Sequence, residues 1–378
     1  SSDVILSQMR EQAQIAIDTA DVIIFMTDLK QGLVDADGKV ADMLRRSRKP
    51  VILTVNKVDS FSRDMADVYE FYNLGIGDPI PVSAANRTGI GELLDAVLEY
   101  FPALEQQEEE DERPRVAIVG KPNVGKSSLI NRLLGEQRLI VSDIAGTTRD
   151  AVDTAVRYDG KEYVFIDTAG LRRKSKVKEE LERYSIIRTV TAVERADVVV
   201  IMIDASEGVT EQDAKIAGIA HDRGKGIVVA VNKWDAVEKD DKTIYKFTAR
   251  VREVLSFMSY AEILFISART GQRISRLFET IDMVIANQNM RVGTGVLNEI
   301  MTEAVALQQP PTDKGKRLKL FYITQVAVKP PTFVIFVNDK ELMHFSYTRY
   351  IENKIRDTFG FRGTALKFII RERKEKES

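Results

Sequence analysis

The sequence predicts two related α/β units with doubly wound, mostly parallel sheets, followed by a small α+β domain. Three observations support this. Strand-length apolar runs alternate with helix-length stretches between residues 115 and 287. A second copy of the same polar motifs lies upstream at a constant offset. From residue 288 onward the predicted order changes to helix, two strands, helix and strand.

Composition limits the class of protein. With 378 residues the chain is too long for one ordinary core, and 44% hydrophobic residues are enough for several. The formal net charge is −2, yet residues 288–378 hold 16 Lys and Arg against 10 Asp and Glu, so this end is the candidate polyanion surface. The absence of cysteine excludes disulfides and thiolate metal sites and fits a cytoplasmic protein. The apolar runs are too short for a membrane span, and no signal peptide is recognised.

Residues 120–128 read Gly-Lys-Pro-Asn-Val-Gly-Lys-Ser-Ser between an apolar run and a helical stretch. This is G-x-x-x-x-G-K-[ST] in strand–loop–helix context, where backbone N–H groups and a helix N-terminus surround phosphate oxygens. We expect Lys126 to reach the β- and γ-phosphates of a nucleoside triphosphate and the Ser127 hydroxyl to ligate Mg²⁺. The other phosphate-binding candidates are Gly120, Lys121, Pro122, Asn123, Val124, Gly125 and Ser128.

A downstream motif, Asn-Lys-Trp-Asp at residues 232–235, selects the base. The Asp235 carboxylate can accept from both guanine N1–H and N2–H₂, whereas adenine N1 is an acceptor. Because a wrong base leaves polar groups unpaired, the nucleotide is predicted to be GTP or GDP. The Ala268 N–H is expected to reach the base, and Trp234 to be a packing residue. The base-site candidates are Asn232, Lys233, Trp234, Asp235, Ser267, Ala268 and Arg269.

Between these motifs, the segment Asp167, Thr168, Ala169, Gly170 and Leu171 follows a predicted strand. Asp167 is expected to hold Mg²⁺ through water, and the Gly170 N–H to sense the γ-phosphate. Residues 146–150, Gly-Thr-Thr-Arg-Asp, would supply a threonine to Mg²⁺. Thr148 is the predicted metal ligand, and Thr147 is the alternative ligand. The competing interpretation is that residues 146–150 form only an ordinary turn.

Hydrolysis needs charge stabilisation that residue 171 cannot give. A water-orienting glutamine could follow Asp-x-x-Gly, but the chain has Leu171. The Asn123 side chain could ligate K⁺ beside the phosphates, or it could only make a turn contact. Arg149 and the basic residues 172–174 could stabilise charge or simply be solvated. The catalytic candidates are therefore Lys126, Thr148, Gly170 and Asn123, and the metal candidates are Ser127, Thr148 and Asp167.

An internal repeat accounts for the first unit. A shift of 176 residues places Asp28 on Asp204 and residues 56–59 on residues 232–235, and both copies continue into Ser-Ala. The first-unit nucleotide candidates are Asn56, Lys57, Val58, Asp59, Ser83, Ala84 and Ala85. Under this shift the first phosphate loop would precede Ser1, so we expect about 60 residues to be absent. The alternative is a degenerate unit that begins here, which would expose buried strand edges.

These observations predict four segments: residues 1–103, 104–114 (an acidic linker), 115–287 and 288–378. In the third segment we expect strands at 115–119, 163–166, 198–203, 226–231 and 263–266, and helices at 126–134, 179–195, 211–222, 242–257 and 273–285. In the fourth we expect helices at 292–306 and 345–358, and strands at 318–328, 332–337 and 364–370.

The duplicated Asn-Lys-x-Asp, the phosphate loop and the segment Lys-Pro-Pro-Thr-Phe-Val-Ile-Phe-Val-Asn-Asp at 329–339 resemble the EngA or Der family of bacterial tandem GTPases over essentially the whole chain. The resemblance implies two P-loop GTPase domains, the first lacking its N-terminal part, and a KH-like C-terminal domain. It implies a GTPase that binds the large ribosomal subunit and its rRNA during assembly. Its GTPases lack the catalytic glutamine and are often stimulated by K⁺, which agrees with Leu171 and Asn123.

Three functions remain possible at this point. A monomeric GTPase switch, in which hydrolysis changes domain packing and ribosome affinity, is the main hypothesis. An RNA-binding scaffold with a structural nucleotide is its rival, and a GTPase serving RNA modification is disfavoured because no second catalytic constellation appears. Residues 360–363, Gly-Phe-Arg-Gly, have the spacing of an RNA-clamping KH loop but lead into a strand, so a turn is predicted. His221 and His344 are predicted to be structural or surface residues.

Overall fold

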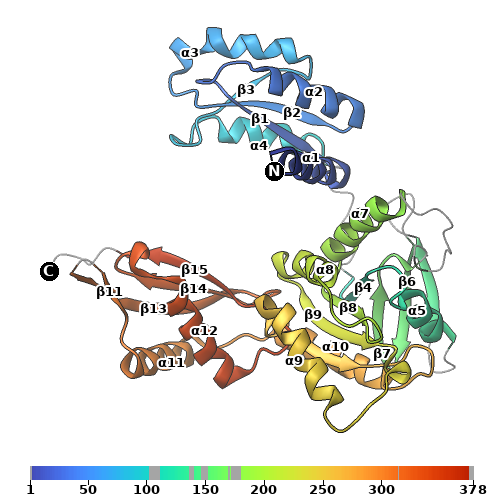
Figure 1. Ribbon diagram of the computed structural model, residues 1–378. Helices are drawn as coiled ribbons and strands as arrows, with labels where there is room; N and C mark the ends of the chain where they lie inside the picture. The colour runs from blue at the N-terminus through green and yellow to red at the C-terminus, as the bar shows by residue number, and fades with distance from the viewer. Residues whose placement is uncertain are drawn as a thin grey trace. The chain divides into compact units, whose positions relative to one another are not determined.

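The computed structural model describes residues 2–101, 111–135, 140–145, 152–168, 171, 180–313 and 315–373. It divides into two compact units, Ser1–Asp111 and Glu112–Ser378 (Figure 1). Most of the predicted acidic linker lies outside the described residues. Among the helices of the described ranges, none combines the length and the hydropathy that crossing a membrane requires.

The first unit is a three-stranded parallel sheet with helices. Its strands, in the order β1-β2-β3, are β1 (Ile23–Asp28), β2 (Val51–Asn56) and β3 (Ile80–Pro81). Its helices are α1 (Ser2–Thr19), α2 (Asp35–Ser47), α3 (Phe61–Val68), the 3-10 helix η1 (Tyr69–Leu74) and α4 (Ile90–Leu98). Asp28 and Asn56, the last residues of β1 and β2, are paired across the sheet.

The second unit begins with a central α/β domain, whose described residues form a seven-stranded sheet in the order β10-β9-β8-β4-β7-β6-β5. These strands are β4 (Arg115–Gly120), β5 (Ile140–Ala145), β6 (Val152–Tyr158), β7 (Lys161–Phe165), β8 (Val198–Asp204), β9 (Gly226–Asn232) and β10 (Glu262–Phe265). Asp204 and Asn232 end β8 and β9 in the register in which Asp28 and Asn56 end β1 and β2. The register of the strands therefore supports the internal repeat.

Helices cover both faces of this sheet (Figure 1). They are α5 (Lys126–Gly135), α7 (Glu180–Arg195), α8 (Glu211–Asp222), α9 (Thr243–Val254) and α10 (Ile274–Gln288), with short 3-10 turns η2 (Trp234–Ala236) and η3 (Ser256–Met258). Alternate residues of β8 enter two cores: Ile201 packs with α7, α8 and α9, whereas Val200 packs with α5 and α10. Strands buried on both faces are continuous apolar runs, which explains why β8 and β9 were predicted from sequence.

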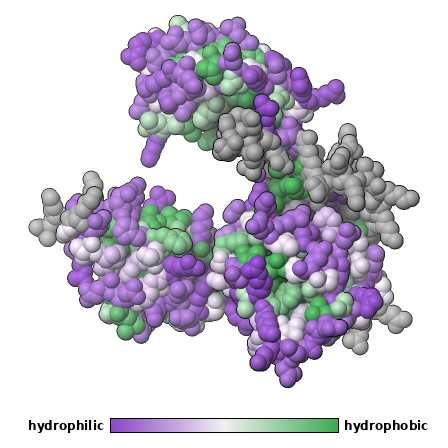
Figure 2. All heavy atoms as spheres, in the orientation of Figure 1, coloured by the Kyte–Doolittle hydropathy of each residue, from purple (hydrophilic) through white to green (hydrophobic). Residues whose placement is uncertain are grey.

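The C-terminal domain is a three-stranded sheet packed against two helices. Its elements are α11 (Thr294–Leu307), β13 (Leu320–Ala327), β14 (Thr332–Val337), the 3-10 helix η4 (Lys340–Leu342), α12 (Phe345–Phe359) and β15 (Lys367–Glu372), with a small hairpin of β11 (Thr312–Asp313) and β12 (Lys316–Arg317). Strand β14 pairs antiparallel with β13 and parallel with β15. On the face seen in Figure 2, hydrophilic residues predominate over both domains of this unit.

The Gly-Phe-Arg-Gly segment is a turn, as predicted, and it docks onto the central domain. The Gly363 N–H donates to the Tyr260 carbonyl at 2.8 Å, and the Ile227 N–H donates to the Gly363 carbonyl at 2.7 Å. Arg362 adds a bidentate ion pair with Glu262, at 2.7 and 2.8 Å. Gly363 therefore joins two domains, and the segment does not stand between two helices as an RNA clamp would.

The structure differs from the predicted elements mainly at the edges. Strands β5 and β6 were not predicted, and they form an antiparallel edge beside β7. The last strand begins at Lys367 and not at residue 364, because residues 361–364 make the docking turn. The helix expected at 242–257 ends at Val254 and is followed by the turn η3.

Candidate nucleotide site

The phosphate loop follows β4 and passes very close to its neighbours. A Cβ added at Gly120 would lie 2.7 Å from the Met202 carbonyl oxygen, and one at Gly125 would lie 2.2 Å from Asn232 Nδ2. Both glycines have positive φ, of 155° and 105°. Any larger residue would push the loop away from the strands that hold it, so glycine is required at both positions.

Lys126 lies inside this loop. Its Nζ donates to the carbonyls of Gly120 at 2.5 Å and Lys121 at 2.8 Å. Burial lowers its pKa to about 8. A buried ammonium held by neutral carbonyls still has its full charge available for an anion, which suits the predicted contact with phosphate oxygens.

The Lys121 side chain points to another element. It is 7% exposed, and its Nζ lies 2.8 Å from Glu207 Oε2 and 3.7 Å from Asp213 Oδ2. Asp213 also caps the start of α8, where it accepts from the Thr210 N–H at 2.8 Å, and burial raises its pKa. Lys121 can thus serve a nucleotide only through its backbone, and its side chain fixes the phosphate loop to α8.

Asn232 links the phosphate loop to the base loop, which we define as Ser267, Ala268 and Arg269. Its Nδ2 donates to the Val124 carbonyl at 2.8 Å, and its Oδ1 accepts from the Ala268 N–H at 2.9 Å. The Ala268 N–H, which was predicted to reach the base, is thus bonded to Asn232 instead. Lys233, with φ of 63°, donates from Nζ to the Asn123 carbonyl at 2.7 Å and pairs with Asp204 at 2.6 Å. The structure therefore brings together the phosphate-loop and base motifs, which lie more than 100 residues apart.

Asp235 is oriented by the same base loop. Its Oδ1 accepts from the Ser267 hydroxyl at 2.6 Å, and its Oδ2 pairs with Arg269 at 2.6 Å. The Ser267 hydrogen bond, followed by that of Arg269, holds the pKa of Asp235 below its usual value. The carboxylate is ionised at neutral pH and can accept from two donors of a base. Trp234 is 3% exposed and packs against Phe247 and Phe265, as a packing residue should.

The metal candidates supply oxygen atoms. Asp167 follows β7, where its N–H donates to Asp153 Oδ1 at 2.9 Å and Arg188 Nε lies 3.8 Å from its Oδ2. The Ser127 hydroxyl donates to the Leu171 carbonyl. A hydroxyl and a carboxylate are hard ligands that fit Mg²⁺. Thr147, Thr148, Arg149, Ala169, Gly170 and residues 172–174 lie outside the described residues. Asp, Glu and His form no metal-binding group of three elsewhere in the described ranges.

Asn123 and Leu171 bear on catalysis. Asn123 is exposed and has φ of 66°, a conformation that asparagine tolerates better than most residues, so the turn interpretation has direct support. Leu171 is partly buried against the core that α5 and α10 share. Its side chain packs against this core and, being a hydrocarbon, offers no group that could orient water. Thr168 is buried, and its hydroxyl is bonded to that of Thr154 at 2.5 Å.

The first unit repeats the base site. Asn56 Oδ1 accepts from the Ala84 N–H at 3.0 Å, and the Ser83 hydroxyl donates to Asp59 Oδ1 at 3.0 Å. Lys57 pairs with Asp28 at 2.5 Å, as Lys233 does with Asp204. Asp59 Oδ2 is 2.9 Å from Lys30, and not from a residue of its own base loop, because Ala85 stands where the second unit has Arg269. Val58 is buried in this unit's core.

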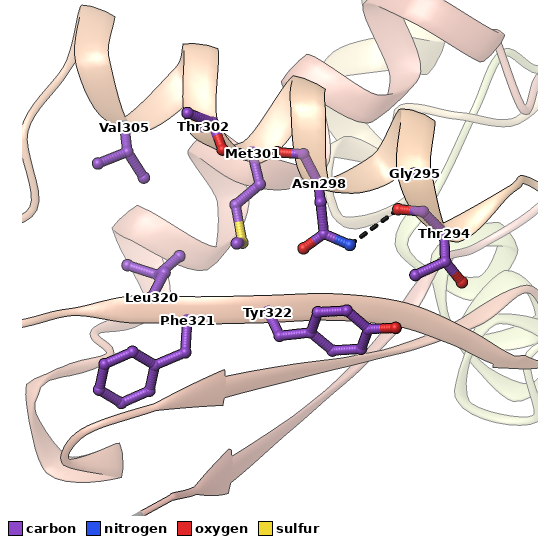
Figure 3. Close-up of a pocket in the computed structure, with 9 residues that line it drawn as sticks. All are labelled: Thr294, Gly295, Asn298, Met301, Thr302, Val305, Leu320, Phe321 and Tyr322. Carbon is purple, nitrogen blue, oxygen red and sulfur yellow. Dashed lines mark hydrogen bonds between the residues drawn. The ribbon is translucent and has the colours of Figure 1, made fainter. Parts of the chain in front are cut away.

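Figure 3 shows a groove of about 500 Å³ between α11 and β13 of the C-terminal domain. Asn298 lies in it, but its Nδ2 donates to the carbonyls of Thr294 and Ile323, and its Oδ1 accepts from the Ile323 N–H. The asparagine therefore fastens α11 to the edge strand. Among the residues that line the groove, Tyr322 is the one with an ionisable side chain.

Two family models match the chain. Residues 115–233 match the model described as "50S ribosome-binding GTPase", and residues 291–371 match "KH-domain-like of EngA bacterial GTPase enzymes, C-terminal". The GTPase Der of Agathobacter rectalis is 76% identical over 377 residues, which cover 100% of this chain and 86% of that protein. The chain belongs to the GTPase Der family. It is therefore a GTPase with a KH-like C-terminal domain.

A further Der-family relative and a solved structure are less similar to this chain. The GTPase Der of Clostridium botulinum strain Hall is 58% identical over 376 residues, covering 100% of this chain and 85% of that protein. Among solved structures, Era in complex with MgGDPNP and a segment of 16S ribosomal RNA is 24% identical and covers 69% of this chain and 94% of that chain, with a TM-score of 0.36. The Der-family assignment rests on the first two relatives and the family models.

Proposed function

We propose that this GTPase acts as a switch in the assembly of the large ribosomal subunit, and that its nucleotide state sets its affinity for the subunit and rRNA. The observation that supports the proposal is the direct structural connection between the second nucleotide site and the KH-like domain. The site lies at the carboxyl ends of β4, β8 and β9, and the Gly363 turn is bonded to Ile227 at the opposite end of β9. One sheet thus connects the candidate nucleotide site to the candidate RNA-binding domain.

In the proposed mechanism, Lys126 and the backbone N–H groups of residues 120–127 hold the β- and γ-phosphates. Asp235 accepts from guanine, and the Ala268 N–H, bonded to Asn232 Oδ1, holds the base loop in place beside it. Ser127 and Asp167, with Thr148, would hold Mg²⁺, which when bound neutralises charge on the phosphate oxygens. Water attacks the γ-phosphorus, and the bond to the β–γ bridging oxygen breaks to release phosphate and GDP. The chain's part is positioning and charge stabilisation, because Leu171 packs in the core.

We further propose that the chain has three folded parts, residues 1–103, 115–287 and 288–378. The acidic segment 104–114 links the first part to the second. The first compact unit ends at Asp111, which lies inside the proposed linker 104–114 and so supports a boundary there. The excess of positive charge after residue 288 supports the KH-like domain as the rRNA-facing part. We also propose that the protein is monomeric and cytoplasmic and that it binds the large subunit.

Co-sedimentation with purified ribosomal subunits tests the switch. We expect the chain to sediment with the large subunit when a non-hydrolysable GTP analogue is present, and to remain largely in the supernatant with GDP or without nucleotide. The small subunit is the control. Equal sedimentation in all three nucleotide states would contradict the switch.

The rival function is an RNA-binding scaffold whose nucleotide is hardly turned over, and Leu171 in place of a water-orienting glutamine favours it. Phosphate release with GTP and Mg²⁺ separates the two. The switch requires catalytic turnover of GTP in K⁺ or Na⁺. Faster phosphate release in the presence of the large subunit would support it further. Binding of rRNA without any turnover would support the scaffold.

A further inference from the structure

Arg132 joins the helix that follows the phosphate loop to the base loop. Its Nε donates to the Ala268 carbonyl and its Nη2 donates to the Arg269 carbonyl. Helix α5, which carries the arginine, is anchored in the core by its buried residues Leu129, Ile130 and Leu133. A planar guanidinium presents several donors in a fixed geometry, so it can fix two successive carbonyls at once. Arg132 belongs to none of the nucleotide motifs.

Ala268 is consequently held from both sides. Its N–H donates to Asn232 Oδ1 at 2.9 Å, and its carbonyl accepts from Arg132. Asn232 is itself bonded to the Val124 carbonyl of the phosphate loop at 2.8 Å. The base loop is therefore connected to the phosphate loop by two routes, one through Asn232 and one through α5.

Gly271 leaves the space that the guanidinium needs. A Cβ at this position would lie 2.9 Å from Arg132 Nη1 and 3.4 Å from its Cζ, and the residue has φ of +84°. The bridge between Ser267 and Gln272 corresponds to the bridge between Ser83 and Thr88, which places Arg87 at the equivalent position of the first unit. In the second unit the space beside the Arg132 side chain is thus kept open by a glycine, whereas the first unit has an arginine at the equivalent position.

We propose that Arg132 is a positioning residue for guanine recognition, which holds the base loop at the distance from the phosphate loop that a guanine nucleotide must span. The same loop carries Ser267, whose hydroxyl donates to Asp235 Oδ1 at 2.6 Å, so the orientation of the base-reading carboxylate depends on where the loop lies. The inference rests on the proposed role of Asp235 in binding the base.

The test compares four variants of the full chain, Arg132→Ala, Arg132→Lys, Arg250→Ala and Asp235→Asn, with the unchanged protein. Two binding quantities are measured, together with kcat and KM for GTP hydrolysis: the dissociation rate of a fluorescent GDP analogue, and the ratio of affinities for GDP and IDP, whose base lacks the N2 amine. For Arg132→Ala we expect dissociation about tenfold faster and a GDP preference reduced about fivefold, because the loop is no longer fixed. The kcat at saturating GTP should change less than about twofold, and KM should rise.

Arg132→Lys should give an intermediate effect, because an ammonium is a point charge without the planar fork. Arg250→Ala is the matched control, since Arg250 is an exposed arginine of the same domain that pairs with the exposed Glu253. It should leave both quantities unchanged. If Arg132→Ala does not fold, Arg132→Lys decides by the same measurements.

A lowered melting temperature with unchanged dissociation and unchanged GDP preference in Arg132→Ala and Arg132→Lys would overturn the inference, because it would show a purely structural contact. Asp235→Asn, measured in parallel, separates this failure from that of the proposed base site. If Asp235→Asn changes the preference and the Arg132 variants do not, only the positioning role is wrong. If Asp235→Asn also has no effect, the base site itself is wrongly assigned.

Discussion

The Ile227 N–H donates to the Gly363 carbonyl at 2.7 Å, although the two residues belong to different domains. Gly363 also donates to Tyr260, so one residue of the KH-like domain bridges β9 and the segment that leads into β10. The Arg356 guanidinium lies over the Tyr260 ring at 5.3 Å, and the Tyr260 hydroxyl is bonded to His221 Nδ1 at 2.7 Å. His221 is a structural residue, as predicted. The central and KH-like domains are thus joined through their backbones as well as their side chains.

Gly363→Ala should destabilise this junction. A Cβ there would lie 2.2 Å from Val284 Cγ2, and the residue has φ of +81°. Overpacking together with left-handed strain should lower the free energy of unfolding by about 3 kcal/mol, measured by urea denaturation. Gly360→Ala is the control, because its φ is +82° but its Cβ would meet no atom within 4 Å. It should cost about 1 kcal/mol. Equal losses in the two variants would show that the Val284 contact is unimportant.

The sequence could predict the buried strands but not the edge of the sheet. Strand β8 is buried at all seven positions, so its sequence is a continuous apolar run. Strand β6 contains Asp153, Thr154 and Arg157, and its pairing with β5 and β7 is antiparallel. Because β6 is made of mixed polar and apolar residues, nothing in its composition distinguished it from a loop.

The candidate site was predictable where its residues follow one another in the chain. The phosphate loop and the Asn-Lys-Trp-Asp motif are local patterns with known spacing. Arg132 and the pair of Lys121 with Glu207 are contacts between residues 86 or more positions apart, so no local pattern reveals them. Gly271 was the only available signal, because an unassigned glycine can mark a close approach of another group.

Nucleotide binding should take up a proton at alkaline pH through Lys126. Its pKa is lowered to about 8 in the free protein, and a nearby triphosphate should raise it again. Below about pH 7 the ammonium is already protonated and no uptake is expected. At about pH 9 it is largely neutral before binding, so uptake should approach one proton. Calorimetry of GTP binding in two buffers of different ionisation enthalpy measures this number.

Lys126→Arg controls for the assignment of that proton, because arginine stays charged throughout this pH range and should abolish the difference between pH 7 and pH 9. The same uptake in the unchanged protein at both pH values would argue against the depressed pKa. Lys126→Ala should abolish triphosphate binding or turnover at the second site, since it removes the positive charge that faces the β- and γ-phosphates.

Asp235→Asn should weaken the preference for guanine. The carboxylate accepts at both oxygens, whereas an amide has one acceptor and one donor group, so it fits guanine poorly and xanthine better. We expect a loss of guanine-nucleotide affinity on the order of 100-fold, together with a gain for xanthosine diphosphate. Competition binding with the two diphosphates measures the ranking. An unchanged ranking would mean that Asp235 does not contact the base.

The last prediction concerns how the enzyme compensates for Leu171. If the Asn123 side chain ligates a monovalent cation beside the phosphates, hydrolysis should be faster in K⁺ than in Na⁺ at equal ionic strength. One preorganised contact of this kind contributes on the order of 3 kcal/mol to the barrier, or about 100-fold in rate. Phosphate release in the two salts gives the ratio, and equal ionic strength removes differences in screening.

Asn123→Ala should abolish most of the K⁺ advantage and leave GDP affinity nearly unchanged, because GDP lacks the γ-phosphate on which charge develops. Asn123→Gly is the matched control for the backbone, since residue 123 has φ of 66° and glycine adopts it freely without supplying an oxygen. Both variants should lose the advantage if the side chain ligates the ion. If Asn123→Gly keeps it and Asn123→Ala loses it, the asparagine serves only the turn. Equal rates in K⁺ and Na⁺ for the unchanged protein would place the compensating charge elsewhere, with Arg149 or a ribosomal group as the next candidate.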